Sequence, residues 1–218
     1  MWPIVATWMG CADPQVETPA DVPRGEEPVV LPAPATLRRL TRAQYEATLD
    51  DLLGPGLVLP PYLEPDLAVE GLFSVGAGQA SLSPYGVEQY ETAAQLVASQ
   101  VMGDPDRRAA VVPCTPSAPD DRGCAEDFVR SFGRLAWRRT LTEQEVARLA
   151  DVAVLAGTTL DSGDAGLEYA MSALLQSPSF LYRVEIGQGG HFDDLELASR
   201  LSYLLWGGPP DAELLDAA

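Results

Sequence analysis

The segment from Phe128 to Tyr182 limits how this 218-residue chain folds more than any other, because it reads as consecutive amphipathic helices. Phe128, Phe132 and Leu135 recur at i, i+4 and i+7, which predicts one apolar stripe on a helix that ends near Arg139. The next two helices have buried stripes at helical spacing: Val146, Leu149 and Ala153, then Leu167, Ala170, Met171, Leu174 and Leu175. We expect the three helices to pack against one another without any sheet.

Capping signals predict where these helices begin and end. Thr142 and Glu145 stand in the positions of a capping box, in which each side chain bonds the other residue's backbone N–H. Pro178 ends the third helix, because the residue before a proline is pushed out of helical geometry. Upstream, Thr41-Arg-Ala-Gln44 predicts another capping box, and Ser83-Pro84 predicts a helix that starts with proline.

These patterns predict an all-α fold of two packed helical units with long irregular Pro/Gly-rich loops, after a disordered N-terminal tether. We divide the chain into an export or lipoprotein signal remnant (1–11), a tether (12–35), a first helical domain (36–103), a disulfide-closed loop (104–124), a second helical domain (125–187) and the truncated start of a third (190–218). We therefore expect the chain to be part of a longer protein.

The last part predicts two helices, one capped by Asp193 or Asp194 and one capped by Asp211. The first of them has apolar residues that need a packing partner: Leu197, Leu201, Leu204 and Leu205.

The first eleven residues are apolar and uncharged and end at Cys11, before a polar, Pro-rich stretch. This is the pattern at the end of an export signal that precedes a lipid-modified cysteine. An ordinary disordered N-terminus is the alternative, because the segment has no basic residue and has Trp8 where such signals usually have leucine.

The formal net charge of −18 limits the kinds of partner that the chain can bind. It opposes nucleic-acid binding, which needs clustered cations, and it opposes docking on an anionic bilayer through charge. We expect a lipid anchor to be the sole membrane contact. The expected partners are other domains of the parent protein or envelope proteins.

Cys114 and Cys124 are close enough in sequence to close a hairpin-like loop. In an exported protein such a pair forms a disulfide, and a lipidated Cys11 leaves an even number of cysteines. The alternative is a pair of free thiols in a cytosolic protein. The chain contains no Cys-x-x-Cys-His, so we expect no cofactor here and assign haem c, if the parent protein has it, to the region beyond residue 218.

No pattern predicts a catalytic residue or a metal site. His191 is the single histidine, in a Gly-rich connection, and Gly-x-Ser-x-Gly does not occur. Neighbouring carboxylates such as Asp193-Asp194 do not share a helix face and read better as caps. Asp161-Ser-Gly-Asp164 lacks the ligand pattern of a calcium loop and reads as a turn and cap. We lean against this chain being an enzyme.

Arg134, Arg138 and Arg139 are the most notable charged cluster. One interpretation is a site for an anion or an acidic polymer. The other, which an acidic chain favours, is internal neutralisation, for example by Glu185 or by acidic residues of the first helical unit, with Trp137 stacked on a guanidinium. The aromatic residues at helical spacing are expected in the core rather than in a ligand site: Tyr45, Tyr90, Phe132, Trp137, Phe180 and Trp206.

Four ordered motifs resemble the planctomycete-type, cytochrome-c-associated domains of large exported bacterial proteins, which are mostly domains of unknown function. Leu37–Gly54 resembles the opening domain's RLxRxEYxNTxRDLLG, Phe132–Glu143 the next domain's FaxRAfRRPLT, Leu174–Glu185 that domain's LxSPxFLYRxE ending, and Asp194–Leu215 the start of a third domain. Ala47, Leu135 and Thr140 stand where these motifs have Asn, Arg and Pro. The resemblance implies an exported helical protein, and it leaves the activity open.

We expect a helical scaffold or interaction domain of an exported, lipid-anchored envelope protein, at the outer membrane, in the periplasm or on the cell surface, beside cytochrome c redox modules. One alternative is the N-terminal fragment of an extracellular oxidoreductase or polysaccharide-related hydrolase whose active site lies beyond residue 218. Another is a polysaccharide- or protein-binding surface module, which an exposed aromatic groove around Trp137 or Trp206 favours.

Overall fold

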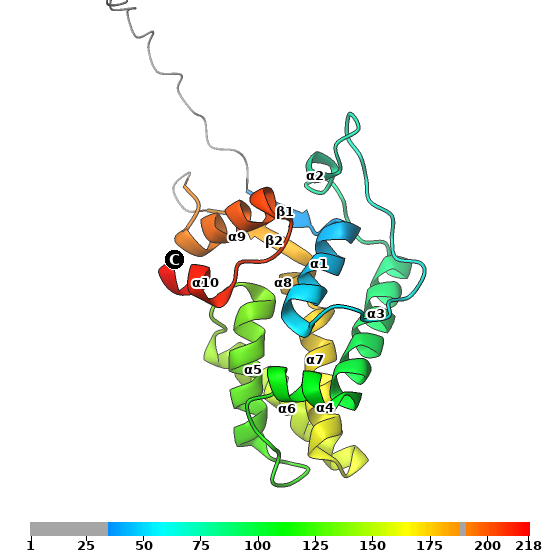
Figure 1. Ribbon diagram of the computed structural model, residues 1–218, viewed down its shortest axis with the longest axis vertical. Helices are drawn as coiled ribbons and strands as arrows, with labels where there is room; N and C mark the ends of the chain where they lie inside the picture. Colours follow the sequence, from blue (N-terminus) through cyan, green and yellow to red (C-terminus); the bar gives the residue numbers. More distant parts are fainter. Residues whose placement is uncertain (1–34, 188–190) are drawn as a thin grey trace, which may run out of the picture. The chain divides into compact units, whose positions relative to one another are not determined.

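The computed structural model of the protein describes residues 35–187 and 191–218 (Figure 1). The fold is mostly helical, as the hydrophobic periodicity predicts. Its centre is formed by α5 (Arg122–Trp137), α6 (Glu143–Leu160) and α7 (Gly163–Leu175), and α3 (Pro84–Gly103) packs on α7. The largest fully buried side chains include those of Tyr45, Tyr90, Phe128, Phe180 and Met171.

The predicted caps are present. Thr142 accepts a hydrogen bond from the backbone N–H of Glu145, whose carboxylate accepts from the N–H of Thr142, so α6 begins with a complete capping box. The same reciprocal pair, Thr41 with Gln44, starts α1 (Arg42–Leu53). The helix α1 ends at Gly54, whose φ of 83° is one that a side chain other than glycine adopts with strain.

The expected loop 104–124 is wrong in its first half, because α4 (Pro105–Val111) lies there. Asp104 caps it by accepting from the N–H groups of Asp106 and Arg107, and a proline occupies the first helical position, where no N–H is needed. A further short helix, α2 (Phe73–Gly76), lies within the long Pro/Gly-rich segment between α1 and α3.

The expectation of a helical unit without a sheet is also corrected. The strands β1 (Thr36–Arg39) and β2 (Tyr182–Glu185) form a two-stranded antiparallel sheet, with Thr36 opposite Glu185 and Arg39 opposite Tyr182. Each strand has four residues, too few to show a two-residue alternation, and the partners are far apart in sequence. The sheet ties the beginning of the described chain to the end of the α5–α7 unit.

After the sheet come α9 (Asp194–Leu205) and α10 (Ala212–Ala217), which contact each other, and α9 also contacts β2 (Figure 1). Asp193 and Asp211 cap them, as predicted. The short helix α8 (Pro178–Leu181) connects α7 to β2. None of the described helices has the length and apolar character needed to cross a bilayer.

Candidate functional site

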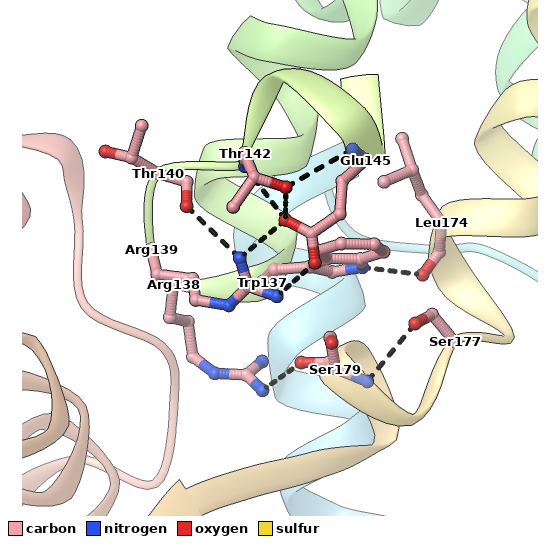
Figure 2. Close-up of polar contacts among 9 residues, drawn as sticks. All are labelled: Trp137, Arg138, Arg139, Thr140, Thr142, Glu145, Leu174, Ser177 and Ser179. Carbon is pink, nitrogen blue, oxygen red and sulfur yellow. Dashed lines mark hydrogen bonds and ion pairs between the residues drawn. The ribbon is translucent and has the colours of Figure 1, made fainter. Parts of the chain in front are cut away.

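Arg138 ends α5 in a left-handed conformation, with φ of 58°, and turns its buried side chain toward backbone carbonyls (Figure 2). Its Nη1 donates to the carbonyl oxygen of Ala136 at 3.0 Å. Its Nη2 donates to those of Ser179 at 2.9 Å, Phe180 at 3.2 Å and Tyr182 at 2.8 Å. No described carboxylate forms an ion pair with it. Arg138 therefore holds the end of α5 to α8 and β2.

Arg139 is held by a carboxylate and a ring. Its Nη1 and Nη2 donate to the two Glu145 oxygens at 3.0 and 2.8 Å. The guanidinium lies 5.2 Å from the Trp137 ring centroid, which confirms the predicted stacking. The Trp137 indole N–H donates to the Leu174 carbonyl oxygen at 3.1 Å (Figure 2). The bonds from Arg139 first, then those from Thr142, lower the pKa of Glu145 from its usual 4.5 to about 2.

Arg134, the third member of the cluster, pairs with Asp216 of α10. Neither suggested source of partners, Glu185 or the acidic residues of the first helical unit, pairs with these arginines. The Glu185 carboxylate is bonded by Arg38 at 2.8 Å and by Arg200 at 3.0 Å. Each guanidinium of the cluster has a partner within the chain.

A cavity of about 240 Å³ opens beside this cluster. Its lining includes Arg138 and Arg139, but also the carboxylate residues Asp193 and Glu196. Since both signs of charge line it, the cavity has no strong preference for an anion.

A buried junction that sequence reasoning missed lies around Tyr203 of α9. The centres of two guanidinium groups, those of Arg138 and Arg183, lie 5.8 and 5.2 Å from the Tyr203 ring centroid. The Tyr203 hydroxyl is hydrogen-bonded to the hydroxyl of Thr48 in α1, at 2.8 Å. Arg183 and Tyr203 each lie in one of the recognised family motifs, which marks them as candidates. No sequence pattern, however, predicts that their side chains are in contact.

Glu185 is the negative centre next to this junction. Its side chain is 4% exposed, and it lies within ion-pair distance of three arginines: Arg38, Arg183 and Arg200. Burial lowers the pKa of Arg183, and the charge of Glu185 opposes that effect. One buried carboxylate with several cations makes the junction a polar contact between the sheet and α9.

The structure contains the predicted disulfide between Cys114 and Cys124. It closes the connection that leads into α5. The proposed lipid site, Cys11, lies outside the described residues, as do the signal remnant 1–11 and nearly all of the tether 12–35.

No catalytic arrangement emerges from the described residues. His191 is exposed at the start of the segment that leads into α9. Asp161 takes a left-handed conformation at the end of α6, and Ser162 caps α7, so this stretch is a turn and cap. Within residues 35–187 and 191–218, no three His, Cys, Asp or Glu side chains are grouped so that they could hold a metal ion. A covalent haem does not fit these residues either, because Cys114 and Cys124 are bonded to each other.

Trp206, expected in the core, is instead 62% exposed. It lines a groove of about 480 Å³, between the end of α9 and the start of α10, together with Leu52 of α1 and Leu135 of α5. The prediction failed because helical spacing shows which residues share a face, but not whether that face is covered.

The described chain consists of three consecutive helical regions that are joined through buried polar contacts. The protein therefore belongs to the class of proteins built from several small helical domains. Family comparison matches the same regions: PSD3, a protein of unknown function (DUF1587), at residues 38–103; PSD5, a protein of unknown function (DUF1595), at residues 124–185; and PSD4, a protein of unknown function (DUF1592), at residues 192–218. The chain belongs to this family of planctomycete-type, cytochrome-c-associated domains. A search of curated proteins finds no match, and a search of solved structures finds none.

Proposed function

We propose that the chain is a non-catalytic helical scaffold of an exported cell-envelope lipoprotein, which works beside cytochrome c redox modules. The observation that carries the proposal is the junction at Tyr203, because side chains from all three matched regions meet there. Thr48 comes from the first region, Arg138 and Arg183 from the second, and Tyr203 from the third. A buried polar junction of this kind favours a fixed arrangement of domains over independent domains on linkers.

Limited proteolysis tests the scaffold. We expect residues 35–218 to resist cleavage as one piece and to unfold in a single transition. Tyr203→Ala should release the 192–218 region to protease while leaving the α5–α7 unit resistant. Tyr169→Ala, which removes a half-exposed tyrosine of α7, is the matched control. Early removal of 192–218 from the unaltered protein would contradict the scaffold.

The Cys114–Cys124 disulfide supports export, since such bonds persist in oxidising compartments. Lipid anchoring rests on the sequence around Cys11. Expression in a bacterial host with metabolic labelling by a fatty acid tests both. We expect label in the membrane fraction, loss of label in Cys11→Ser, and no free thiol at Cys114 or Cys124. An unlabelled protein with two free thiols in the cytosol contradicts this part of the proposal.

A surface-binding module is the second candidate, because the groove at Trp206 is an exposed aromatic feature of the kind that such a function requires. A third reading, an enzyme fragment with its active site beyond residue 218, has no supporting arrangement among the described residues. To test the second candidate, soluble polysaccharides are added to the protein while its tryptophan fluorescence is measured. The Trp206→Phe variant shows how much of any change comes from the other tryptophans.

A further inference from the structure

Two hollows lie along one side of α3 and share a lining residue, Thr92. The first, of about 250 Å³, lies between α3 and residues 60–62 of the connection that follows α1. The second, of about 390 Å³, lies between α3 and α7. At about 100° per residue, the α3 residues that line the hollows fall within an arc of about 120°, so they share one side of the helix. They are Tyr85, Glu88, Gln89, Thr92, Gln95, Leu96 and Ser99.

Exposed tyrosine rings line both hollows. Tyr62 and Tyr85 line the first, with exposed fractions of 76% and 67%, and Tyr169 of α7 lines the second, at 51%. Among residues 35–187 and 191–218, these three are the tyrosines that are more than half exposed. We call the two hollows and the residues that line them the α3 surface. A tyrosine combines an apolar ring with a polar hydroxyl, so a row of exposed tyrosines suits a ligand that is also both apolar and polar.

The connection that forms one wall of the first hollow is fixed at both ends. The Gln100 side chain accepts from the backbone N–H of Val58 and donates to its carbonyl oxygen, both at 2.8 Å. The Glu64 carboxylate accepts from the N–H of Ser83 at 3.1 Å and from its hydroxyl at 2.8 Å. Residues 60–62 lie between these two anchors. A wall that is already ordered reduces the entropy lost when a ligand binds.

The other groups that line the α3 surface form hydrogen bonds but carry no positive charge. They include the carboxylates of Glu88 and Glu168, two side-chain amides and several hydroxyls, and no arginine is among them. Ser172 lines the second hollow and is 5% exposed, and its Oγ has no hydrogen-bond partner among the described residues. Since buried hydroxyls are ordinarily bonded, this one indicates a partner from outside the chain.

We propose that the α3 surface binds a neutral polysaccharide chain, with sugar rings stacked on Tyr62, Tyr85 and Tyr169. This inference goes beyond the scaffold function, and its site is separate from the Trp206 groove. The C–H groups on one face of a sugar ring pack on an aromatic ring, while the sugar hydroxyls both donate to and accept from polar side chains. From Tyr85 to Ser99, α3 is about 21 Å long, which gives room for several sugar rings.

The same residues disfavour other ligands. An acidic polymer would be repelled by Glu88 and Glu168 and would find no cation in the hollows. A proline-rich peptide also packs on exposed aromatic rings, but proline has no N–H to donate to these carboxylates. A folded protein needs an apolar interface centre, whereas the aliphatic lining here is limited to Leu96 and two prolines.

Calorimetry on the purified, oxidised chain tests the proposal at two salt concentrations. The probes are neutral hexasaccharides of glucose, xylose and mannose, with the matching disaccharides. Polygalacturonic acid represents the acidic polymers, and a synthetic proline-rich peptide represents the extended peptides. Circular dichroism verifies that each variant is folded.

We expect a neutral hexasaccharide to bind with an affinity that salt does not change, because no charges are paired. Its disaccharide should bind more weakly, since it fills part of the surface. Tyr85→Ala and Tyr169→Ala should each weaken hexasaccharide binding at least about fivefold, as removal of an interface anchor does. Phe73→Ala, at an exposed aromatic residue of α2, should leave binding unchanged, and so should Trp206→Phe.

The proposal would be overturned if none of the neutral hexasaccharides binds, or if binding survives intact in both tyrosine variants. Tighter binding of the acidic polymer or of the peptide would also overturn it. Binding that is lost in Trp206→Phe but kept in the tyrosine variants would assign the saccharide to the Trp206 groove instead. Because the assay uses purified protein, its outcome is independent of export, lipidation and the scaffold function.

Discussion

The hydroxyls of Tyr203 and Thr48 share a buried hydrogen bond of 2.8 Å across 155 positions of sequence. Thr48 donates its own hydroxyl proton to the Gln44 carbonyl oxygen at 2.6 Å, so the Tyr203 hydroxyl donates to Thr48. This hydrogen bond connects α9 to α1.

Tyr203→Phe should lower the free energy of unfolding by about 1 kcal/mol, since it deletes one buried hydrogen bond and keeps the ring between the two arginines. Tyr203→Leu should lower the free energy of unfolding further, because it also removes the ring contacts with Arg138 and Arg183. Urea denaturation measures both. Tyr169→Phe, at a half-exposed tyrosine, serves as the control, and an equal loss there would remove the special role of Tyr203.

Arg138 and Arg139 are neighbours with unequal roles. Arg138→Met should destabilise the protein by roughly 2–4 kcal/mol, because it leaves several buried carbonyls without a donor. Arg139→Met should cost about 1 kcal/mol or less, since that side chain is about one-third exposed and its salt bridge with Glu145 is screened. Similar losses from the two variants, measured by urea denaturation, would contradict the assignment.

Glu145 should give the protein a specific acid sensitivity. Its pKa of about 2 lies below the usual 4.5, so the carboxylate adds stability above pH 4.5 that disappears as the pH falls toward 2. Glu145→Gln keeps the capping geometry and should flatten stability between these two pH values. Unfolding curves at pH 6, 4 and 3 report the change. Glu143→Gln, at an exposed carboxylate in the same turn, is the matched control.

Gly157→Ala should destabilise by more than about 2 kcal/mol, because its Cβ would stand 2.1 Å from the Pro119 carbonyl oxygen and the backbone would have to move. At Gly103, the last residue of α3, a Cβ meets nothing within 4 Å. Gly103→Ala should therefore be neutral or stabilise by up to about 1 kcal/mol. Thermal unfolding of the two variants makes the comparison, and a tolerated Gly157→Ala would mean that the two segments are less close than described.

Replacing Cys114 and Cys124 together by alanine should lower stability by about 2–3 kcal/mol, the value for closing a short loop in the unfolded chain. Reducing agent should produce a similar loss in the unaltered protein and none in the double variant. Thiol titration under native conditions checks the starting state. A protein purified with both thiols free and full stability would contradict a structural role for this bond.

The caps show what local sequence predicts well. Thr142 with Glu145, and Thr41 with Gln44, lie within four residues of each other, so a short-range hydrogen bond settles the helix start before any packing. The sheet and the junction show the opposite. Thr36 lies opposite Glu185, and Tyr203 contacts Thr48, only because the helices between them fold back. No local sequence pattern predicts contacts between residues so far apart in the chain. The arginine cluster lies between these cases, since Trp137 stacking was predicted and the partners of Arg138 were not.

The helical class, most of the helix ends, the disulfide pair and the family can be predicted from the residues alone, because they depend on residue spacing and on short-range hydrogen bonds. Which side of α9 is buried depends on contacts between distant parts of the chain. The leucines have the spacing of a core stripe, yet Tyr203 and the small residues beside it face inward, because the arginines and Thr48 supply polar partners there. Periodicity defines a face, but the groups that meet it in three dimensions decide whether that face is buried.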